Sequence, residues 1–356
     1  MKILNIVGAR PQFIKASVIS RILNNSEKNI KEILVHSGQH YDNNMSDVFF
    51  SELNITRPKY YIKSNKKNTD LQFGDIMSEL RKIAINEKPN LFLVYGDTNT
   101  TLASALVASK MSIKIAHVES GLRSYRLGMD EEINRLLTDR LSDYLFCNSL
   151  IEKNTLDEEG IIGEKYVVGD IMYDSYKFFF NKINKNIDQI KHPNKILLTM
   201  HRAENVDDKN TLSNLIMFLN ALSLEFEIHF PIHPRTNQKI KDFNINLSGK
   251  IKLFNPFSYS ELIKQLNSSS YVITDSGGLQ KEAYFSKTKC FTIREETEWN
   301  NTLKNNANTI LSPKINYTGL IEKLKKSINN KYRFDNSLFG KGNAGEKIIE
   351  VIKSRV

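Results

Sequence analysis

The stretch over residues 91–138 constrains the fold of this chain more than any other part of the sequence. One apolar, strand-like segment within it runs into Asp97, and a second one ends at Glu119. A helix is predicted after each segment, and Glu131 and Glu132 open the second helix. Open α/β sheets bind their ligands at the carboxyl ends of the strands, so these carboxylates are predicted to share a site there. Clustered carboxylates suit proton abstraction and return.

The same alternation of strand and helix continues along most of the 356 residues, a length that favours two domains. It predicts an α/β fold with two Rossmann-like domains, each built on a parallel sheet, facing each other across a cleft. Between the two series, around residues 169–191, the pattern becomes polar and rich in Lys and Asn. The predicted strands lie near residues 2–7, 31–36, 91–95, 114–118, 144–147 and 165–168, and then near 195–200, 227–231, 251–254, 271–274 and 289–293, with helical patterns at 210–222, 259–267 and 278–286.

The composition, with 40% apolar and 25% charged residues, is that of an ordinary globular protein. We find no signal sequence and no apolar run near the roughly 20 residues of a spanning helix, so no membrane partner is expected. Cys147 and Cys290 lie in or beside strand-like segments, which favours buried free thiols and a cytoplasmic location. The net charge of +10 comes from scattered lysines, which favours a solvated surface or weak attraction of an anionic substrate over nucleic-acid binding.

A Ser-Gly-Gly turn follows a predicted strand of the second series, at Ser276, Gly277 and Gly278. Such a turn at a helix N-terminus presents backbone N–H groups to an anion, and the glycines allow close approach. A plain helix cap explains these residues equally well. Glu282 lies one helical turn further on, where its carboxylate can accept hydrogen bonds from ribose hydroxyls. Together these residues fit a nucleoside diphosphate.

A second turn, GARP, follows the first strand. It does not match GxGxxG, and no acidic residue follows the second strand where a nicotinamide ribose needs one, so no dinucleotide cofactor is expected. Arg10 in this turn is interpreted as a guanidinium aimed at phosphate. Lys15, in the helix that follows, is either a solvated lysine or a cleft residue. Arg135, four residues after Glu131, is either an ion-pair partner or a diphosphate ligand.

His201 and His233 each follow a predicted strand of the second series. A lone histidine at a strand end is more often structural, so the residues alone leave the role of His201 open. His233 is interpreted as a cleft residue. No Cys/His spacing indicates a zinc site, and no metal is expected.

Ordered motifs run along nearly the whole chain. Besides the 91–138 stretch they are GARPQFIKAS, SGQHYD, MHRAEN, IHPRT and TDSGGLQKEA, which begin at Gly8, Ser37, Met200, Ile232 and Thr274. As an ordered set they resemble the non-hydrolysing UDP-N-acetylglucosamine 2-epimerase family. The resemblance implies the glycosyltransferase-B architecture and a last helix, near 344–354, that crosses back onto the first domain. The expected domains are residues 1–170 with 344–356, which carry the catalytic carboxylates, and 171–343, which bind UDP.

The resemblance also implies site residues. Asp97, Glu119 and Glu131 match the family's three catalytic carboxylates, although the sequence does not tell base from acid. Asp97 can instead cap a helix, and Glu131 can simply favour the helix dipole, whereas Glu119 has no comparable structural alternative. The resemblance places His201 at the reaction site and favours ligand contact for Arg10, Arg135, Ser276, Gly277, Gly278 and Glu282.

The implied reaction inverts C2 of a UDP-2-acetamido sugar, whose C2 proton is not next to a carbonyl. Elimination of UDP to a 2-acetamidoglucal, followed by re-addition, avoids an unstabilised carbanion. This route needs a base, an acid and firm binding of the departing diphosphate, and it needs no cofactor.

Two departures from the family pattern concern the substrate. Gln12 stands where a glutamate is usual, and Trp299 interrupts the usual TERPE motif. Both resemble the subgroup that acts on UDP-2,3-diacetamido-2,3-dideoxyglucuronate for surface polysaccharide, and the lost charge at Gln12 would ease binding of a uronate near Arg10. In addition, Gln39-His40 is followed by Tyr41-Asp42 and not by Arg-Glu, which argues against allosteric activation by the substrate.

Three other functions remain open: a UDP-sugar glycosyltransferase, a hydrolysing epimerase and a non-enzymatic nucleotide-sugar sensor. A glycosyltransferase usually has fewer cleft carboxylates, the first motifs fit the hydrolysing branch poorly, and a sensor need not keep three carboxylates together. We therefore predict an epimerase, expected to be a cytoplasmic homodimer with a UDP-sugar as its small-molecule partner.

Overall fold

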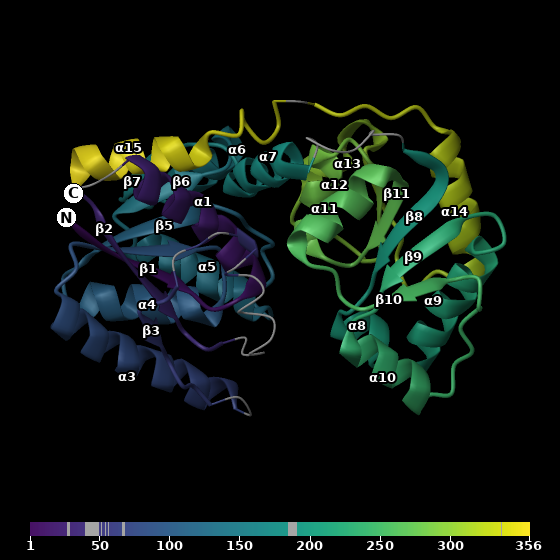
Figure 1. Ribbon diagram of the computed structural model, residues 1–356, viewed down its shortest axis with the longest axis horizontal. Helices are drawn as coiled ribbons and strands as arrows, with labels where there is room; N and C mark the ends of the chain where they lie inside the picture. The colour runs from purple at the N-terminus through teal and green to yellow at the C-terminus, as the bar shows by residue number, and fades with distance from the viewer. Residues whose placement is uncertain are drawn as a thin grey trace. The chain divides into compact units, whose positions relative to one another are not determined.

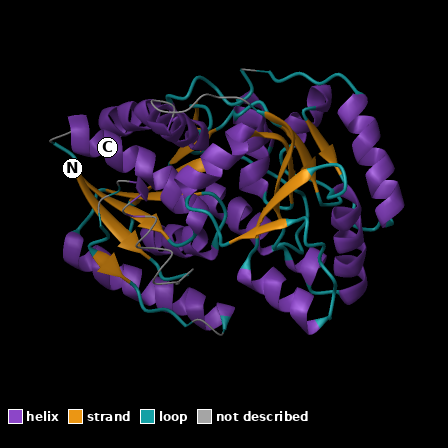
Figure 2. Cartoon of the chain, turned by 45° about the vertical axis from the view of Figure 1, so that its right-hand side comes forward, coloured by secondary structure: helices purple, strands orange, loops and turns teal. Residues whose placement is uncertain are grey.

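The computed structural model describes residues 1–26, 29–39, 50, 52–53, 55, 57–65, 68–183, 191–335 and 337–356. The chain forms two compact units, Met1–Lys177 with Asn336–Val356, and Phe178–Asp335. Each unit contains one sheet, and the paired strands in both sheets are parallel (Figure 1 and Figure 2). The predicted α/β class with two parallel sheets is confirmed.

The sheet of the first unit has seven strands in the order β3-β2-β1-β4-β5-β6-β7. The order reverses between β1 and β4, so the loops after these strands start on either side of a topological switch point, where open sheets bind ligands. The strands are β1 (Lys2–Val7), β2 (Lys31–His36), β3 (Tyr60–Tyr61), β4 (Leu91–Tyr95), β5 (Lys114–Ser120), β6 (Tyr144–Cys147) and β7 (Glu164–Val167). The helices are α1 (Arg10–Ser26), α3 (Thr69–Glu87), α4 (Asn99–Lys110), α5 (Asp130–Leu141), α6 (Leu150–Glu158), α7 (Ile171–Ile183), which continues into the second unit, and α15 (Ala344–Arg355).

The sheet of the second unit has six strands in the order β10-β9-β8-β11-β12-β13, and its order reverses between β8 and β11. The strands are β8 (His192–Thr199), β9 (Glu227–Pro231), β10 (Lys252–Phe254), β11 (Ser269–Thr274), β12 (Lys289–Thr292) and β13 (Asn308–Ile310). The helices are α8 (Ala203–Val206), α9 (Lys209–Leu222), α10 (Pro234–Asp242), α11 (Tyr259–Ser268), α12 (Gly277–Phe285), α13 (Asn300–Leu303) and α14 (Tyr317–Asn329).

Local sequence explains where these elements begin. All five residues of β4 are apolar and buried, as is typical of a parallel strand covered on both faces. Asn68, Thr98 and Ser258 cap α3, α4 and α11, because each side chain accepts a hydrogen bond from the backbone N–H three residues later.

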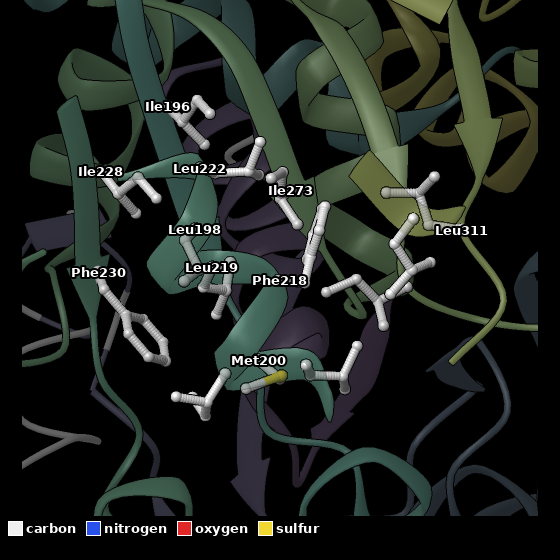
Figure 3. Close-up of a cluster of buried hydrophobic side chains, with 14 of the residues drawn as sticks. Ile196, Leu198, Met200, Phe218, Leu219, Leu222, Ile228, Phe230, Ile273 and Leu311 are labelled. Atoms are coloured by element: carbon white, nitrogen blue, oxygen red, sulfur yellow. The ribbon is translucent and has the colours of Figure 1, made fainter. Parts of the chain in front are cut away.

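The core of the second unit lies between α9 and the sheet (Figure 3). Phe218 and Leu219 of α9 share this fully buried cluster with Ile196, Leu198 and Ile273 of β8 and β11. Burying one such side chain stabilises the fold by about 1.5–3 kcal/mol. The core therefore holds together the two strands whose loops flank the switch point.

The last helix, α15, packs against α1 of the first unit (Figure 1). A Cβ at Gly345 would lie 2.5 Å from Cγ1 of Val18, so glycine permits this close approach. Asp174 of α7 accepts a hydrogen bond from the backbone N–H of Gly345 at 2.8 Å. Among the described residues, no helix is long and apolar enough to span a membrane.

Three features differ from the sequence-based expectation. Helix α7 occupies part of the segment that appeared only polar, since its apolar residues, such as the buried Phe179, alternate with Lys and Asn. Strands β3 and β13 were not predicted, because two or three residues carry no readable period. Residues 40–42 of SGQHYD and residues 184–190 of the Lys/Asn-rich segment lie outside the described residues.

Candidate active site

In the first unit, a buried ion pair lies at the carboxyl edge of the sheet. Nζ of Lys15, from α1, pairs with Oε2 of Glu119, and both side chains are only 6% exposed. Of the alternatives for Lys15, the solvated helix lysine is therefore wrong. Because an unpaired buried charge is costly, each of the two buried side chains stabilises the charged form of the other.

Glu119 has an unusual backbone. Its φ of 72° lies in the left-handed region, and the β5–β6 register shifts between Val118 and Ser120. The prediction that the strand ends at Glu119 was wrong, since β5 continues to Ser120 through this irregularity. Bulges and strained conformations of this kind cluster at functional sites, where they re-aim a side chain.

Gly96 gives the ion pair its space. Its φ is 63°, and a Cβ there would lie 3.2 Å from Nζ of Lys15 and 3.4 Å from Oε2 of Glu119. The glycine after β4 therefore serves both the left-handed turn and the close approach of the pair.

Asp97 follows directly and meets α5. Its Oδ2 lies 3.3 Å from Nε of Arg135, and its carbonyl oxygen accepts a hydrogen bond from Nδ2 of Asn134 at 3.0 Å. Thr98, and not Asp97, caps α4, so the capping alternative for Asp97 does not hold. Arg135 is buried and forms an ion pair with Asp97. It does not pair with the Glu131 carboxylate; its Nε lies 3.2 Å from the backbone carbonyl oxygen of Glu131.

The two glutamates that open α5 differ. Glu131 is exposed in the first helical turn, whereas Glu132 is buried. Carboxylate oxygens of Glu132 accept hydrogen bonds from the backbone N–H groups of Ser124 and Tyr125 at 2.8 and 2.9 Å. Burial raises the pKa of Glu132, but these hydrogen bonds and Arg135 outweigh it and hold the pKa below its ordinary value. Glu132 therefore anchors the 121–125 loop.

Arg10 is the first residue of α1 and is partly buried, directly after the loop that follows β1. Arg10 therefore follows β1 and Asp97 follows β4, the two strands on either side of the switch point.

In the second unit, Asp275 joins the loops after β8 and β11. One carboxylate oxygen accepts hydrogen bonds from the backbone N–H groups of His201 and Arg202, both at 2.9 Å, and from Nδ2 of Asn205 at 3.1 Å. The other oxygen lies 3.2 Å from Nδ1 of His201, whose ring is partly exposed. His233 caps α10, and its ring centroid lies 5.6 Å from that of His201.

The Ser-Gly-Gly turn forms the start of α12. Ser276 is its N-cap and accepts a hydrogen bond from the backbone N–H of Leu279 at 3.5 Å, while Gly277 and Gly278 are its first residues. The cap is therefore present, and the backbone N–H groups in the first turn of a helix point out of its N-terminal end, the arrangement that binds anions. Glu282, further along α12, is buried.

Gly277 makes room for a carboxylate. A Cβ there would lie 2.6 Å from Oε1 of Glu298, and φ of Gly277 is not in the left-handed region, so space and not backbone strain requires the glycine. Nη1 of Arg294 lies 2.7 Å from Oε2 of Glu298. Burial raises the pKa of Glu298, but Arg294 and Arg202 nearby hold it below its ordinary value.

The family model described as UDP-N-acetylglucosamine 2-epimerase matches residues 23–353. The chain belongs to this family. It is 40% identical to the UDP-2,3-diacetamido-2,3-dideoxy-D-glucuronate 2-epimerase of Pseudomonas aeruginosa, over 99% of both chains. The crystal structure of the Methanocaldococcus jannaschii UDP-GlcNAc 2-epimerase in complex with UDP-GlcNAc and UDP is similar, with 38% identity and a TM-score of 0.90 over 99% of this chain and 100% of that one.

The predicted family and glycosyltransferase-B fold class are thereby confirmed, and the chain is an enzyme of the isomerase class. Acinetobacter baumannii MurG shares the fold alone, with 12% identity and a TM-score of 0.58 over 99% of both chains. Among the described residues of this family member, no group of three or more His, Cys, Asp and Glu residues is placed to hold a metal.

Gln12, which the sequence singled out only for a lost charge near Arg10, also has a structural role. Its side chain is 2% exposed, and Oε1 accepts hydrogen bonds from the backbone N–H groups of Gly8 and Ala9 at 2.7 and 3.1 Å. Its Nε2 donates to the carbonyl oxygen of Tyr95 at 2.8 Å. In this epimerase-family chain Gln12 connects the loop after β1 to the end of β4. An ionised glutamate could not replace it, because a carboxylate has no hydrogen to donate to the carbonyl oxygen of Tyr95.

Sequence reasoning also missed residues that support the site. Asp275 lay inside a known motif without an assigned role, Glu132 was counted with Glu131 among the site carboxylates and not as a loop anchor, and Arg294 and Glu298 were not linked to Gly277. His117, two residues before Glu119 on the same strand, was the clearest unused signal, because residues two apart on a strand share a face.

Proposed function

We propose that this chain catalyses C2 epimerisation of a UDP-2-acetamido sugar without hydrolysis, by elimination and re-addition of UDP. Family membership supports the reaction class, and the buried Glu119, re-aimed at the switch point of the first sheet, is the observation that carries the chemistry. A carboxylate paired with a buried lysine is held in one orientation, as a group that takes or returns a proton requires.

The two units take different parts in this proposal. The first, expected over residues 1–170 with 344–356, supplies Asp97, Glu119 and Glu131 for proton transfer. The second, over residues 171–343, binds UDP through the start of α12. Arg10, Lys15, Arg135, His201, His233, Ser276, Gly277, Gly278 and Glu282 are the proposed substrate contacts, with His201 also at the reaction centre.

The elimination requires above all that the negative charge developing on the departing UDP be stabilised. Backbone N–H groups at the start of α12 suit a diphosphate, because they carry partial positive charge and need no proton transfer. Glu282, one turn further, is proposed to accept hydrogen bonds from the ribose. No cofactor is needed, since the UDP-sugar carries its own leaving group, UDP, and carboxylates remove and return the proton at C2.

For the sugar, we propose the 2,3-diacetamido glucuronate, with N-acetylglucosamine as the alternative. The support is local. Nζ of Lys281 lies 4.0 Å from the ring centroid of Trp299, beside Gly277, so a buried cation accompanies the residue that departs from the family pattern. A cation beside the phosphate-binding turn favours a substrate with an additional negative charge. The buried amide of Gln12 does not support this choice.

The test uses both UDP-sugars in deuterated water, followed by proton NMR. The expected product is the C2 epimer, still linked to UDP and carrying deuterium at C2, with faster turnover of the uronate. Free sugar with UDP would identify a hydrolysing enzyme, transfer to an acceptor a glycosyltransferase, and binding without turnover a sensor. Epimer without deuterium would contradict elimination and re-addition.

We also propose that the chain acts in the cytoplasm as a homodimer, and that its product serves surface polysaccharide. Ile133 and Leu137, four residues apart on one face of α5, are 40% and 44% exposed, which supports a covered apolar face. Ile133→Lys with Leu137→Lys should give a monomer by analytical ultracentrifugation. Ile162→Lys, at a residue outside α5 that is 98% exposed, is the control that should keep the dimer.

A further inference from the structure

His117 lies fully buried on β5, beneath the loop that carries Asp97. Its Nδ1 is 2.7 Å from Oδ1 of Asp139 on α5, and its Nε2 is 2.7 Å from the carbonyl oxygen of Gly96. A carbonyl oxygen and a carboxylate are both acceptors, and a neutral imidazole has only one N–H to give. Two good hydrogen bonds therefore require a proton on each ring nitrogen.

The surroundings favour this ionised pair. A neutral alternative would place the proton on Asp139, which would then donate to Nδ1. However, Oδ2 of Asp139 already accepts hydrogen bonds from Nη1 of Arg123 at 2.8 Å and from the backbone N–H of Gly121 at 3.2 Å. Arg123 in turn forms a bidentate ion pair with Glu159, in which Nε and Nη2 donate to Oε1 and Oε2 at 2.7 and 2.6 Å. With His117 charged, two cations face two carboxylates and the network is neutral.

The link joins the segments that carry the three proposed carboxylates. Gly96 is held twice, because its N–H donates to the carbonyl oxygen of Val118 at 2.9 Å and its own carbonyl oxygen accepts from His117. Asp139 lies one helical turn after Arg135 on α5, so it anchors the same face of the helix that reaches Asp97. Glu119 lies two residues after His117 on the same strand.

We propose that His117 is a buried imidazolium which, with Asp139, fixes the relative positions of Asp97, Glu119 and the start of α5, and is thus a positioning residue for proton transfer. The inference rests on the proposed function for its catalytic consequence and on geometry alone for the state of the ring. It concerns only the first unit, so binding of UDP by the second unit should not depend on it.

The state of the ring is tested first, in the wild-type protein. Protein labelled with ¹⁵N in histidine is studied by NMR at neutral pH, and both ring nitrogens of His117 should show a bonded proton. The signal is assigned by its loss in His117→Gln. An Nδ1 without a proton would overturn the proposal, whatever the activity.

The positioning role is tested with His117→Gln and Asp139→Asn. Small displacements of reacting groups cost up to about 10²-fold in rate, so each variant should lose roughly 10- to 100-fold in kcat, with UDP affinity within about twofold of wild type. The double variant should lose no more than the worse single one, because both changes break one link. Wild-type kcat in His117→Gln, or additive losses in the double variant, would overturn the role.

A control separates positioning from general loss of stability. Lys195 is buried at the start of β8 in the second unit, where its Nζ donates to Gln265 and Ser268 at 2.8 and 2.7 Å. Lys195→Gln should lower the melting temperature but keep kcat per folded molecule. If the wild-type protein turns over no UDP-sugar, the proposed function fails, while the NMR result still decides the state of His117.

Discussion

The carboxyl edges of the two sheets occupy the same topological position but are held by different forces. In the first unit, Lys15 pairs with Glu119 and Arg135 with Asp97, at sites where the lysine and arginine are almost completely buried. In the second unit, the buried carboxylate of Asp275 gathers N–H donors, and the partly exposed start of α12 leaves backbone N–H groups for a ligand. The proposed proton-transfer groups of the first edge thus rely on charge pairs, whereas Asp275 and the start of α12 at the second edge rely mainly on backbone N–H groups, with the Arg294–Glu298 pair beside them.

The difference matches the two tasks in the proposed reaction. Groups that exchange protons must change charge, so their environment has to tolerate both forms, and paired neighbours adjust that balance. A diphosphate keeps its charge throughout, so fixed dipoles serve it without any proton movement. Substitutions of the paired carboxylates in the first unit should therefore act on turnover, and substitutions at the start of α12 in the second on UDP affinity.

The largest effect is expected for Glu119→Gln, which keeps the shape and removes the titrating group. Turnover should fall by at least about 10²-fold while UDP affinity is retained, because proton transfer in the first unit is lost and the second unit is untouched. Stopped assays with a calorimetric UDP titration measure both. Glu87→Gln, at another buried glutamate of the first unit, is the matched control and should keep turnover. Near-normal turnover of Glu119→Gln would make Glu119 structural and end the comparison.

Gly277→Val should act in the opposite way, through affinity. The added side chain meets Oε1 of Glu298 and crowds the first turn of α12, so UDP loses hydrogen bonds to a charged group, each worth about 1.5–3 kcal/mol, or roughly 10- to 100-fold in affinity. Calorimetry with UDP alone measures this. Gly249→Val, at an exposed glycine with open space around its Cβ, is the control and should bind UDP normally. Tight UDP binding by a folded Gly277→Val protein would place the nucleotide elsewhere.

Glu282→Ala should weaken UDP by roughly 1–3 kcal/mol, the range for losing hydrogen bonds between a charged group and ribose hydroxyls. The effect should vanish when UDP is replaced by inorganic pyrophosphate, which has no ribose. Glu322→Ala, at an exposed position of α14, is the control on the same unit. An equal loss with both ligands would show that Glu282 acts on the turn and not on the ribose.

The smallest effect concerns Asp174, a carboxyl group for which burial outweighs the stabilisation from nearby hydrogen bonds and Lys177. Burial raises the pKa of Asp174 to about 6, although the backbone N–H groups of Gly345 and Ala344 act to lower it. Between its ordinary value near 4 and about 6, the folded protein binds more protons than the unfolded chain, so the free energy of unfolding falls as the pH rises through this range. Asp174→Asn should reduce this pH dependence and raise the free energy of unfolding by about 1–2 kcal/mol above pH 6.

Urea unfolding of the Asp174→Asn protein between pH 4 and pH 8 measures this change. Asp70→Asn, at an exposed carboxylate of α3, should keep the wild-type slope. A slope unchanged by Asp174→Asn would mean that the backbone N–H groups and Lys177 fully compensate the burial of Asp174.

Local patterns in the sequence predicted most strands and the turns that follow them. The apolar run of β4 can be nothing but a buried strand or core segment, and the turns after β4 and β11 follow from Gly96 and from the Ser-Gly-Gly motif. The order of these elements was enough to predict two parallel sheets. The short strands β3 and β13 and the helix α7 were not predicted, because their apolar patterns are too brief or are interrupted by polar residues.

What the sequence by itself determined is the set of chemical groups and the sheet edges on which they lie. The tertiary structure decided which groups meet: Lys15 with Glu119 across 104 positions of the chain, His117 with Asp139 across 22, and Glu298 against Gly277. It also chose Glu132 over its neighbour Glu131 for burial. Such pairings depend on the register of strands and the rotation of helices, which are set by packing of the whole core and leave no local pattern to read.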